Sequence, residues 1–330
     1  MAYRYGKAIV RSAALALSAL CTGCSTAGFW LIHPAGPVAA AGLQSWIVDT
    51  GATFLVIGPA TLLVMWAIWR YHRRIGKGAY VPGWNHSVGL EATFWGVPQL
   101  VVIGLGFYST YGAFQTEPTH PGAMAVGNNP DARVPAVEID VITTDWQWLF
   151  IYPELHIALA NELVIPVHTP IRFRLTSATV ATDFFIPQLA GQIDVMPGMR
   201  TWQGLIANNV GSYQGFASDY NGPGFSWMRF ETKVVSADDY KIWAKAMADA
   251  PAHLDEAGFL KFAAPTINTK NTVLRFSSVQ NNLFDNVVYN VMMGRIYETP
   301  SGMTEKKSHD VDGGRQPTQG AAPSEQDHMR

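Results

Sequence analysis

Cysteine is nearly absent from this chain of 330 residues, since its two cysteines, Cys21 and Cys24, both lie close to the N-terminus. The remaining sequence therefore offers no disulfide, no thiolate metal site and no cysteine nucleophile. Charged residues are also scarce, at 15 % of the total, and the net charge is −2. No basic stripe is present, which argues against a protein that binds nucleic acid.

Residues 1–23 are typical of a bacterial lipoprotein signal peptide. Basic residues precede a short apolar stretch, residues 12–21, which is too short to span a bilayer. The sequence LCTGC, which ends at Cys24, resembles a lipobox, although Cys21 stands where leucine is usual. We therefore expect Cys24 to be the lipid-carrying start of the mature chain. The alternative is an ordinary signal peptide that is cleaved near Ala27.

Two apolar stretches follow, residues 46–69 and 88–108, and each is long enough to cross a hydrocarbon core of about 30 Å. The sequence thus predicts a transmembrane hairpin over residues 24–114. Its connection, residues 70–87, contains no acidic residue and four basic ones, Arg70, Arg73, Arg74 and Lys77. By the positive-inside rule this loop is cytoplasmic, so the mature N-terminus and everything after residue 113 face the periplasm of the inner membrane.

Beyond the hairpin the sequence predicts a domain of β-strands. Residues 115–235 contain short alternating segments separated by Gly, Pro and Asn turns, a pattern that indicates an antiparallel sandwich or barrel. Residues 236–239, SADD, then provide a helix start signal, and a second helical stretch is expected over residues 282–293. Residues 236–298 are therefore interpreted as a helical extension. Residues 299–330 contain few apolar side chains and are expected to be disordered.

Three motifs follow the two spans in order: Asp145-Trp-Gln-Trp148, DFFIP over residues 183–187 and VMPG over residues 195–198. This arrangement resembles subunit II of the haem-copper oxidases, and the resemblance covers nearly the whole chain after residue 23. It implies a cupredoxin-like sandwich behind the two transmembrane helices. In the cytochrome c oxidases of this family, that domain holds two copper ions. Their ligands are two cysteines, two histidines, a methionine and the backbone carbonyl of an acidic residue.

Most of these ligands are missing here. When residues 215–228 are laid over the copper loop of the family, the cysteines fall at Ala217 and Asn221, and the acidic residue falls at Asp219. The upstream histidine falls at Thr182, the second histidine at Phe225 and the methionine at Met228. A two-copper centre needs two bridging thiolates, so we expect none of these six positions to bind metal.

The resemblance therefore favours the quinol-oxidising branch of the family. It implies a structural subunit with no cofactor of its own, in a complex that oxidises ubiquinol with O₂ and translocates protons. The haems and copper would lie in a partner subunit I, other subunits and membrane lipid would surround the chain, and no soluble cytochrome c would dock. Two alternatives remain open: a cytochrome c oxidase subunit II with copper, and a stand-alone cupredoxin-like membrane lipoprotein.

Three further residues need separate interpretation. Trp146 and Trp148 alternate with Gln147, so we expect both to face one side of a strand and to serve packing rather than electron transfer. Glu91 lies a few residues inside the second span, near its cytoplasmic end, where a carboxylate is a functional hypothesis by default. The resemblance places it at the entrance of a proton pathway into subunit I. The alternative is a side chain that extends to the membrane surface.

Overall fold

The computed structural model describes residues 30–72, 83, 86–116, 136–267, 269–295 and 297. The expected lipidation site Cys24, most of the predicted cytoplasmic loop and the predicted disordered tail lie outside the described residues.

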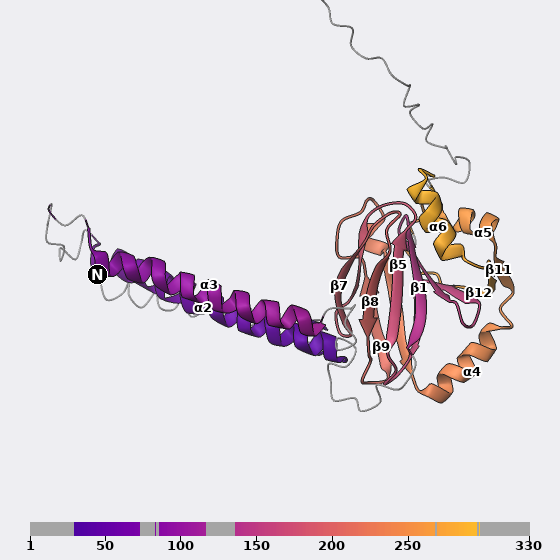
Figure 1. Ribbon diagram of the computed structural model, residues 1–330, viewed down its shortest axis with the longest axis horizontal. Coiled ribbons are helices and arrows are strands. Elements are labelled where there is room, and N and C mark those ends of the chain that lie inside the picture. The colour runs from indigo at the N-terminus through magenta and orange to yellow at the C-terminus, as the bar shows by residue number, and fades with distance from the viewer. Residues whose placement is uncertain are drawn as a thin grey trace, which may run out of the picture.

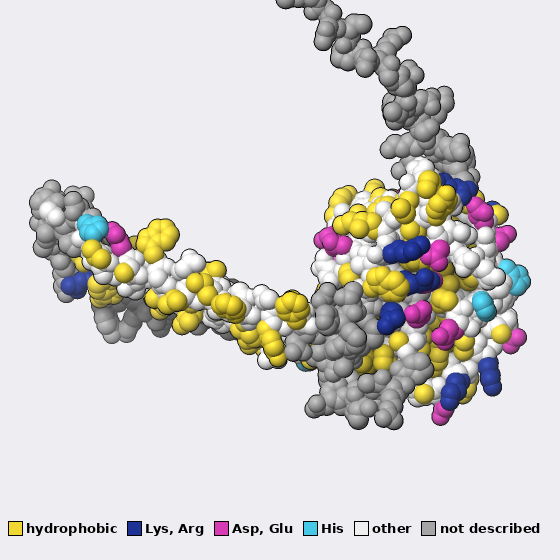
Figure 2. Space-filling view, in the orientation of Figure 1, with side chains coloured by type: hydrophobic (Ala, Val, Ile, Leu, Met, Phe, Trp, Pro, Cys, Tyr) yellow, Lys and Arg dark blue, Asp and Glu magenta, His cyan; other side chains and the backbone are white. Residues whose placement is uncertain are grey.

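A hairpin of two long helices precedes the β domain and extends away from it (Figure 1). Helix α2 spans Pro37–Arg70 and helix α3 spans Val88–Thr116, and both are long and apolar enough to cross a membrane. Apolar side chains cover the hairpin surface along its length (Figure 2). The helix α2 begins at Pro37 rather than at residue 46, and α3 continues to Thr116 rather than to residue 108. Hydropathy identifies only the most apolar part of a helix. The predicted span therefore omits residues 37–45 at the start of α2, a length of about 13 Å.

The domain is a sandwich of two sheets, as predicted. The strands of its main part are β1 (Val137–Thr144), β2 (Gln147–Tyr152), β3 (Ile157–Ala160), β4 (Glu162–Pro166), β5 (Ile171–Ser177), β6 (Thr182–Ile186), β7 (Ala190–Val195), β8 (Thr201–Leu205), β9 (Gly211–Phe216) and β10 (Arg229–Val235). With two later strands, β11 (Ala252–Leu254) and β12 (Leu274–Val279), the larger sheet has the order β11-β12-β3-β2-β1-β5-β8, and the smaller has the order β4-β10-β9-β6-β7. The pairs β1–β5 and β10–β4 are parallel, so the sandwich is not purely antiparallel.

The core between the sheets is aromatic. Trp148, Phe150, Phe184 and Phe230 are fully buried, and their rings are in mutual contact. The ring centroids of Trp148 and Phe230 lie 5.1 Å apart, and those of Phe184 and Phe230 lie 5.3 Å apart in a stacked arrangement. Large rings in contact across two sheets bury much apolar surface and hold the sheets together.

The C-terminal part adds three helices: α4 (Ala237–Met247), α5 (Glu256–Ala263) and α6 (Leu283–Met292). The expected start signal is confirmed, because the Ser236 hydroxyl accepts a hydrogen bond from the Asp239 N–H. The extension also contributes two strands that the sequence analysis did not anticipate, β11 (Ala252–Leu254) and β12 (Leu274–Val279), and β12 pairs with β3.

Helices α5 and α6 cover the outer face of the larger sheet (Figure 1). Leu149 and Ile151 of β2 pack there against Phe259 of α5 and Phe284 of α6 in a second apolar cluster. The strand β2 is consequently buried on both faces. This double burial explains why its sequence is apolar without alternation.

The segment that precedes α2 is bound to the β domain. A short 3-10 helix, η2 (Trp30–Ile32), places the Trp30 ring 5.9 Å from that of Phe216. Ala35 is buried, its N–H donates to the Gln188 carbonyl at 2.7 Å, and its carbonyl accepts from the Asn208 N–H at 2.8 Å. The start of the first helix is therefore fixed to the domain.

Gly36 is required at this junction. A Cβ atom at Gly36 would lie 2.6 Å from the Ile206 carbonyl oxygen and 3.1 Å from the Leu189 carbonyl oxygen. We expect Gly36→Ala to destabilise the chain by about 1–3 kcal/mol, the usual cost of overpacking. The matched control is Gly42→Ala in α2, where a Cβ atom meets nothing within 4 Å. Thermal unfolding of the chain in detergent is the measurement, and equal unfolding temperatures for the two variants would contradict the assignment.

Candidate functional site

Three of the degenerate copper positions meet at one end of the smaller sheet. Thr182 begins β6, Met228 directly precedes β10, and Asn221 lies in the loop between β9 and β10. The Asn221 side-chain amide donates to the Thr182 hydroxyl at 2.8 Å and to the Met228 sulfur at 3.1 Å. The Asn221 side-chain amide thus joins residues that lie far apart in the sequence.

The other three positions surround this contact without adding a ligand to it. Ala217 is buried, and its N–H donates to the Met228 carbonyl at 3.2 Å. Phe225 is half-buried and packs against the Tyr220 ring, with centroids 5.8 Å apart. The Asp219 side chain is exposed, and only its backbone takes part in the hydrogen bonding of the loop.

The loop is held by Asp183, a residue that the sequence analysis noted only as part of a motif. Its fully buried carboxylate accepts hydrogen bonds from the N–H groups of Ser218 and Asp219, each at 2.7 Å, and from the Ser218 hydroxyl. A buried carboxylate requires such partners because leaving it unpaired costs several kcal/mol. An acidic residue within the apolar sequence DFFIP was the available signal.

The two tryptophans differ in their surroundings. Trp148 is buried in β2, and its indole N–H donates to the Met228 carbonyl at 3.4 Å. Trp146 lies instead in the turn before β2, with a φ of 73°, so the expectation that both face one side of a strand is wrong. Its indole N–H donates to the Asn221 carbonyl at 3.3 Å.

Trp146 nevertheless packs on the same loop. Its ring covers Gly222, where a Cβ atom would lie 2.9 Å from the ring and where the φ of +127° favours glycine. Both tryptophans therefore contact the loop between β9 and β10. Trp146 contacts Asn221 and Gly222, and Trp148 contacts Met228 from within the core.

This donor set does not fit a two-copper centre. It contains one thioether, one hydroxyl and one amide, but no thiolate or imidazole. Among the described residues, no group of three or more His, Cys, Asp or Glu side chains could hold a metal ion. The side-chain oxygen of Asn221, Oδ1, is buried without a hydrogen-bond partner, yet a single neutral oxygen beside a thioether cannot replace two bridging thiolates.

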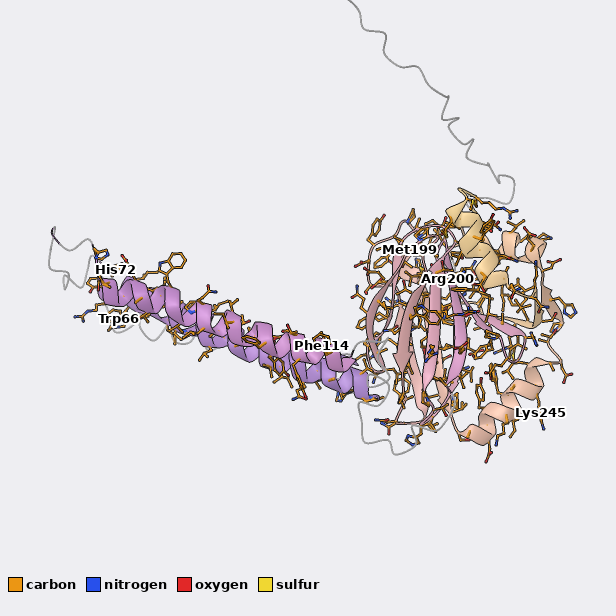
Figure 3. The ribbon with its side chains drawn as sticks, in the orientation of Figure 1. Trp66, His72, Phe114, Met199, Arg200 and Lys245 are labelled. Carbon is orange, nitrogen blue, oxygen red and sulfur yellow. The ribbon has the colours of Figure 1, made fainter. Side chains whose placement is uncertain are left out.

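Glu91 lies in the first turn of α3, at the end of the hairpin away from the domain, and its side chain is exposed. Trp66, near the end of α2, and His72, just after α2, lie at this same end of the hairpin (Figure 3). The Glu91 Oε2 atom is 3.2 Å from His86 Nε2. Sequence reasoning singled out Glu91 but missed His86, because His86 precedes the predicted helix.

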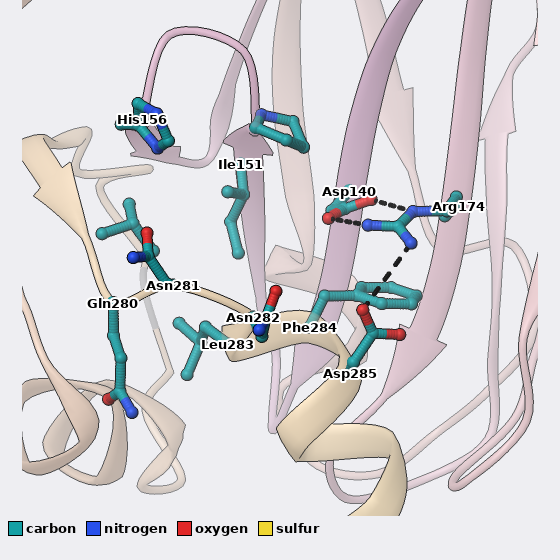
Figure 4. Close-up of a pocket in the computed structure, with 12 residues that line it drawn as sticks. Asp140, Ile151, His156, Arg174, Gln280, Asn281, Asn282, Leu283, Phe284 and Asp285 are labelled. Carbon is teal, nitrogen blue, oxygen red and sulfur yellow. Dashed lines mark hydrogen bonds and ion pairs between the residues drawn. The ribbon is translucent and has the colours of Figure 1, made fainter.

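A separate pocket of about 370 Å³ lies between the larger sheet and the start of α6 (Figure 4). Arg174 binds the buried Asp140 carboxylate through two hydrogen bonds of 2.5 and 2.6 Å. Burial raises the pKa of Asp140, and the Arg174 guanidinium opposes that rise. Arg174 also lies 3.8 Å from Asp285 and over the ring of Phe284, both in α6. The charges in this pocket attach α6 to the sheet.

Comparison with known proteins gives consistent matches. Residues 137–235 match the family described as "Cytochrome C oxidase subunit II, periplasmic domain", and residues 249–295 match the "COX Aromatic Rich Motif". The chain is 35 % identical over 269 residues to cytochrome bo(3) ubiquinol oxidase subunit 2 of Pseudomonas putida, a match that covers 82 % of each chain. It is 34 % identical to ubiquinol oxidase subunit 2 of Acetobacter aceti, over 89 % of this chain and 92 % of that one.

Among solved structures, the chain is similar to the periplasmic domain of subunit II of cytochrome oxidase from Bradyrhizobium japonicum. That match has 24 % identity and a TM-score of 0.33, and it covers 34 % of this chain and 95 % of the other.

The geometry of the loop predicts the behaviour of the chain towards copper. The purified chain, without partner subunits, should show no intense thiolate-to-copper absorption. A variant with four ligands restored (Thr182→His, Ala217→Cys, Asn221→Cys and Phe225→His) should form a purple copper centre, because Asp183 still holds the loop backbone. Copper analysis and the absorption spectrum are the measurements.

The matched control for this experiment restores only the two histidines, at positions 182 and 225, and should stay colourless because it lacks both thiolates. A thiolate-to-copper band in the unmodified chain would contradict the expected loss of copper. A colourless four-ligand variant would show that the loop backbone no longer has the copper-binding shape.

Proposed function

Since the chain belongs to the subunit 2 family of haem-copper quinol oxidases, we propose that it is subunit II of a proton-translocating ubiquinol oxidase. The complex oxidises ubiquinol to ubiquinone and reduces O₂ to water. The haems and copper lie in partner subunit I, and this chain contributes structure and assembly without a cofactor of its own.

The observation that carries this proposal is the contact of Asn221 with Thr182 and Met228. In the copper-binding branch of the family, the copper ions bound by residues at these positions receive electrons from a soluble cytochrome. Here an amide occupies the place of a bridging thiolate, so electrons have no metal to enter in this domain. A membrane quinol that delivers electrons directly to subunit I removes the need for such a site.

The test of this function is purification of the intact protein from its native membrane. We expect a complex with a haem absorption spectrum that oxidises ubiquinol with O₂ and does not oxidise reduced cytochrome c. Reduced cytochrome c serves as the matched substrate control. A haem-free chain without partners would favour the stand-alone lipoprotein, and rapid oxidation of cytochrome c would favour the copper-containing alternative.

The chain is anchored by its two apolar helices, and we propose that it is also a lipoprotein of the inner membrane with its domain in the periplasm. Mass spectrometry of the N-terminal peptide should find acyl chains on Cys24. Cys24→Ala should impair processing yet leave the chain in the membrane, because the two helices remain. An unmodified Cys24, or a mature N-terminus elsewhere, would refute the lipid anchor.

Glu91 is proposed to stand at the entrance of a proton pathway into subunit I. Its exposed carboxylate at the cytoplasmic end of α3 can take protons from water, whereas an amide cannot. The Glu91→Gln complex should assemble with an unchanged haem spectrum. Its ubiquinol-oxidase turnover should fall by up to roughly 10²-fold, the usual effect of removing a proton-transfer group. Glu91→Asp should retain more activity, because it keeps a carboxylate.

The control for this measurement is Asp49→Asn, which removes the other acidic residue of the hairpin without touching the cytoplasmic end. Its turnover should be unchanged. Full turnover of an assembled Glu91→Gln complex would leave Glu91 as a surface group of the membrane. Loss of assembly would assign it a contact with subunit I.

A further inference from the structure

His86 contacts Glu91 at the start of α3. It precedes α3, which begins at Val88. The first hydrogen bond of the helix runs from the Glu91 N–H to the Ser87 carbonyl at 3.0 Å. The chain nevertheless brings His86 Nε2 to 3.2 Å from Glu91 Oε2. Both side chains are more than half exposed, at 58 % and 57 %, so the imidazole is in contact with water and with the carboxylate at once.

The end of α2 and the residues just after it lie at the same end of the hairpin as this pair. Arg70 lies over the Trp66 ring at 5.5 Å, and the rings of Tyr71 and Trp66 are 6.3 Å apart. His72 lies at the same end of the hairpin (Figure 3). The second acidic residue of the two helices, Asp49, lies in the opposite half of α2. Glu91 is thus the one carboxylate of α2 and α3 at this end, and a histidine contacts it.

The chemistry of the two groups is complementary. Glu91 presents a carboxylate in the first turn of α3. An ionised carboxylate can accept a proton, but protons are rare in water near neutral pH. An imidazole takes up and releases protons in that range, so it can supply the carboxylate from a larger reservoir.

We propose that His86 collects protons from the cytoplasm and passes them to Glu91, an inference that rests on the proposed role of Glu91. In the transfer, the Nε2–H bond of the imidazolium breaks and an O–H bond forms on Glu91. The charged pair becomes a neutral pair, and the net charge does not change. Neutral His86 then takes another proton from water, while Glu91 releases its own towards subunit I.

The experiment compares His86→Gln with the unmodified complex, each intact and reconstituted into liposomes. Ubiquinol-oxidase turnover is measured between about pH 6 and about pH 9. We expect a normal haem spectrum, nearly unchanged turnover at the acidic end and a loss of roughly tenfold at the alkaline end. The sign follows because abundant protons reach Glu91 directly at low pH, whereas at high pH delivery depends on His86.

Two further measurements separate a proton-collecting role from a structural one. Added imidazole should restore part of the alkaline turnover of His86→Gln, since the free base can collect protons. In a Glu91→Gln background, His86→Gln should have no additional effect, because the acceptor is gone. The matched control is His253→Gln, which removes an exposed histidine of the periplasmic domain and should leave the pH profile unchanged.

The outcomes distinguish this inference from the proposed function. If Glu91→Gln is slow while His86→Gln keeps the normal pH profile and does not respond to imidazole, the role of His86 is refuted and that of Glu91 stands. If Glu91→Gln turns over at the normal rate, both fail together. If His86→Gln and His86→Asn both prevent assembly, His86 is a structural contact and the proposal is overturned.

Discussion

The buried carboxylate of Asp183 is the constraint on which the periplasmic end of the molecule depends. It fixes the loop between β9 and β10 through hydrogen bonds from Ser218 and Asp219. Moving the loop would leave a charge in an apolar interior, at a cost of several kcal/mol. The contacts of Asn221 and Trp146 are small by comparison and follow from a loop that is already in place.

The loop is also continuous with the rest of the domain. Trp148 donates to the Met228 carbonyl and packs against Phe230, so the loop, the aromatic core and the two sheets form one connected structure. On the opposite side, the ion pairs of Arg174 and the apolar contacts of Phe284 attach the C-terminal helix to the larger sheet.

Much of this architecture could be predicted from sequence, because long apolar runs, alternating strands and the Ser236 capping signal have strong local patterns. The parts that were missed depend on contacts between distant residues. The strand β12 has little alternation and exists because it pairs with β3. The turn at Trp146 breaks an alternation that suggested a strand. Asp183 and His86 acquire their meaning only from partners that the fold brings to them, and no periodicity indicates such partners.

The contacts of residues 30–36 with the β domain couple the orientation of the domain to that of the hairpin. The chain enters the domain before α2 and again after α3, so the domain is attached to the hairpin on both sides of it. The first attachment is a set of short backbone hydrogen bonds directly followed by a helix. Because these bonds join the start of α2 to the domain, the direction of α2 in a bilayer sets the orientation of the sandwich relative to the membrane. The loop between β9 and β10 begins directly after Phe216, whose ring Trp30 contacts, so this loop lies next to the attachment of the first helix.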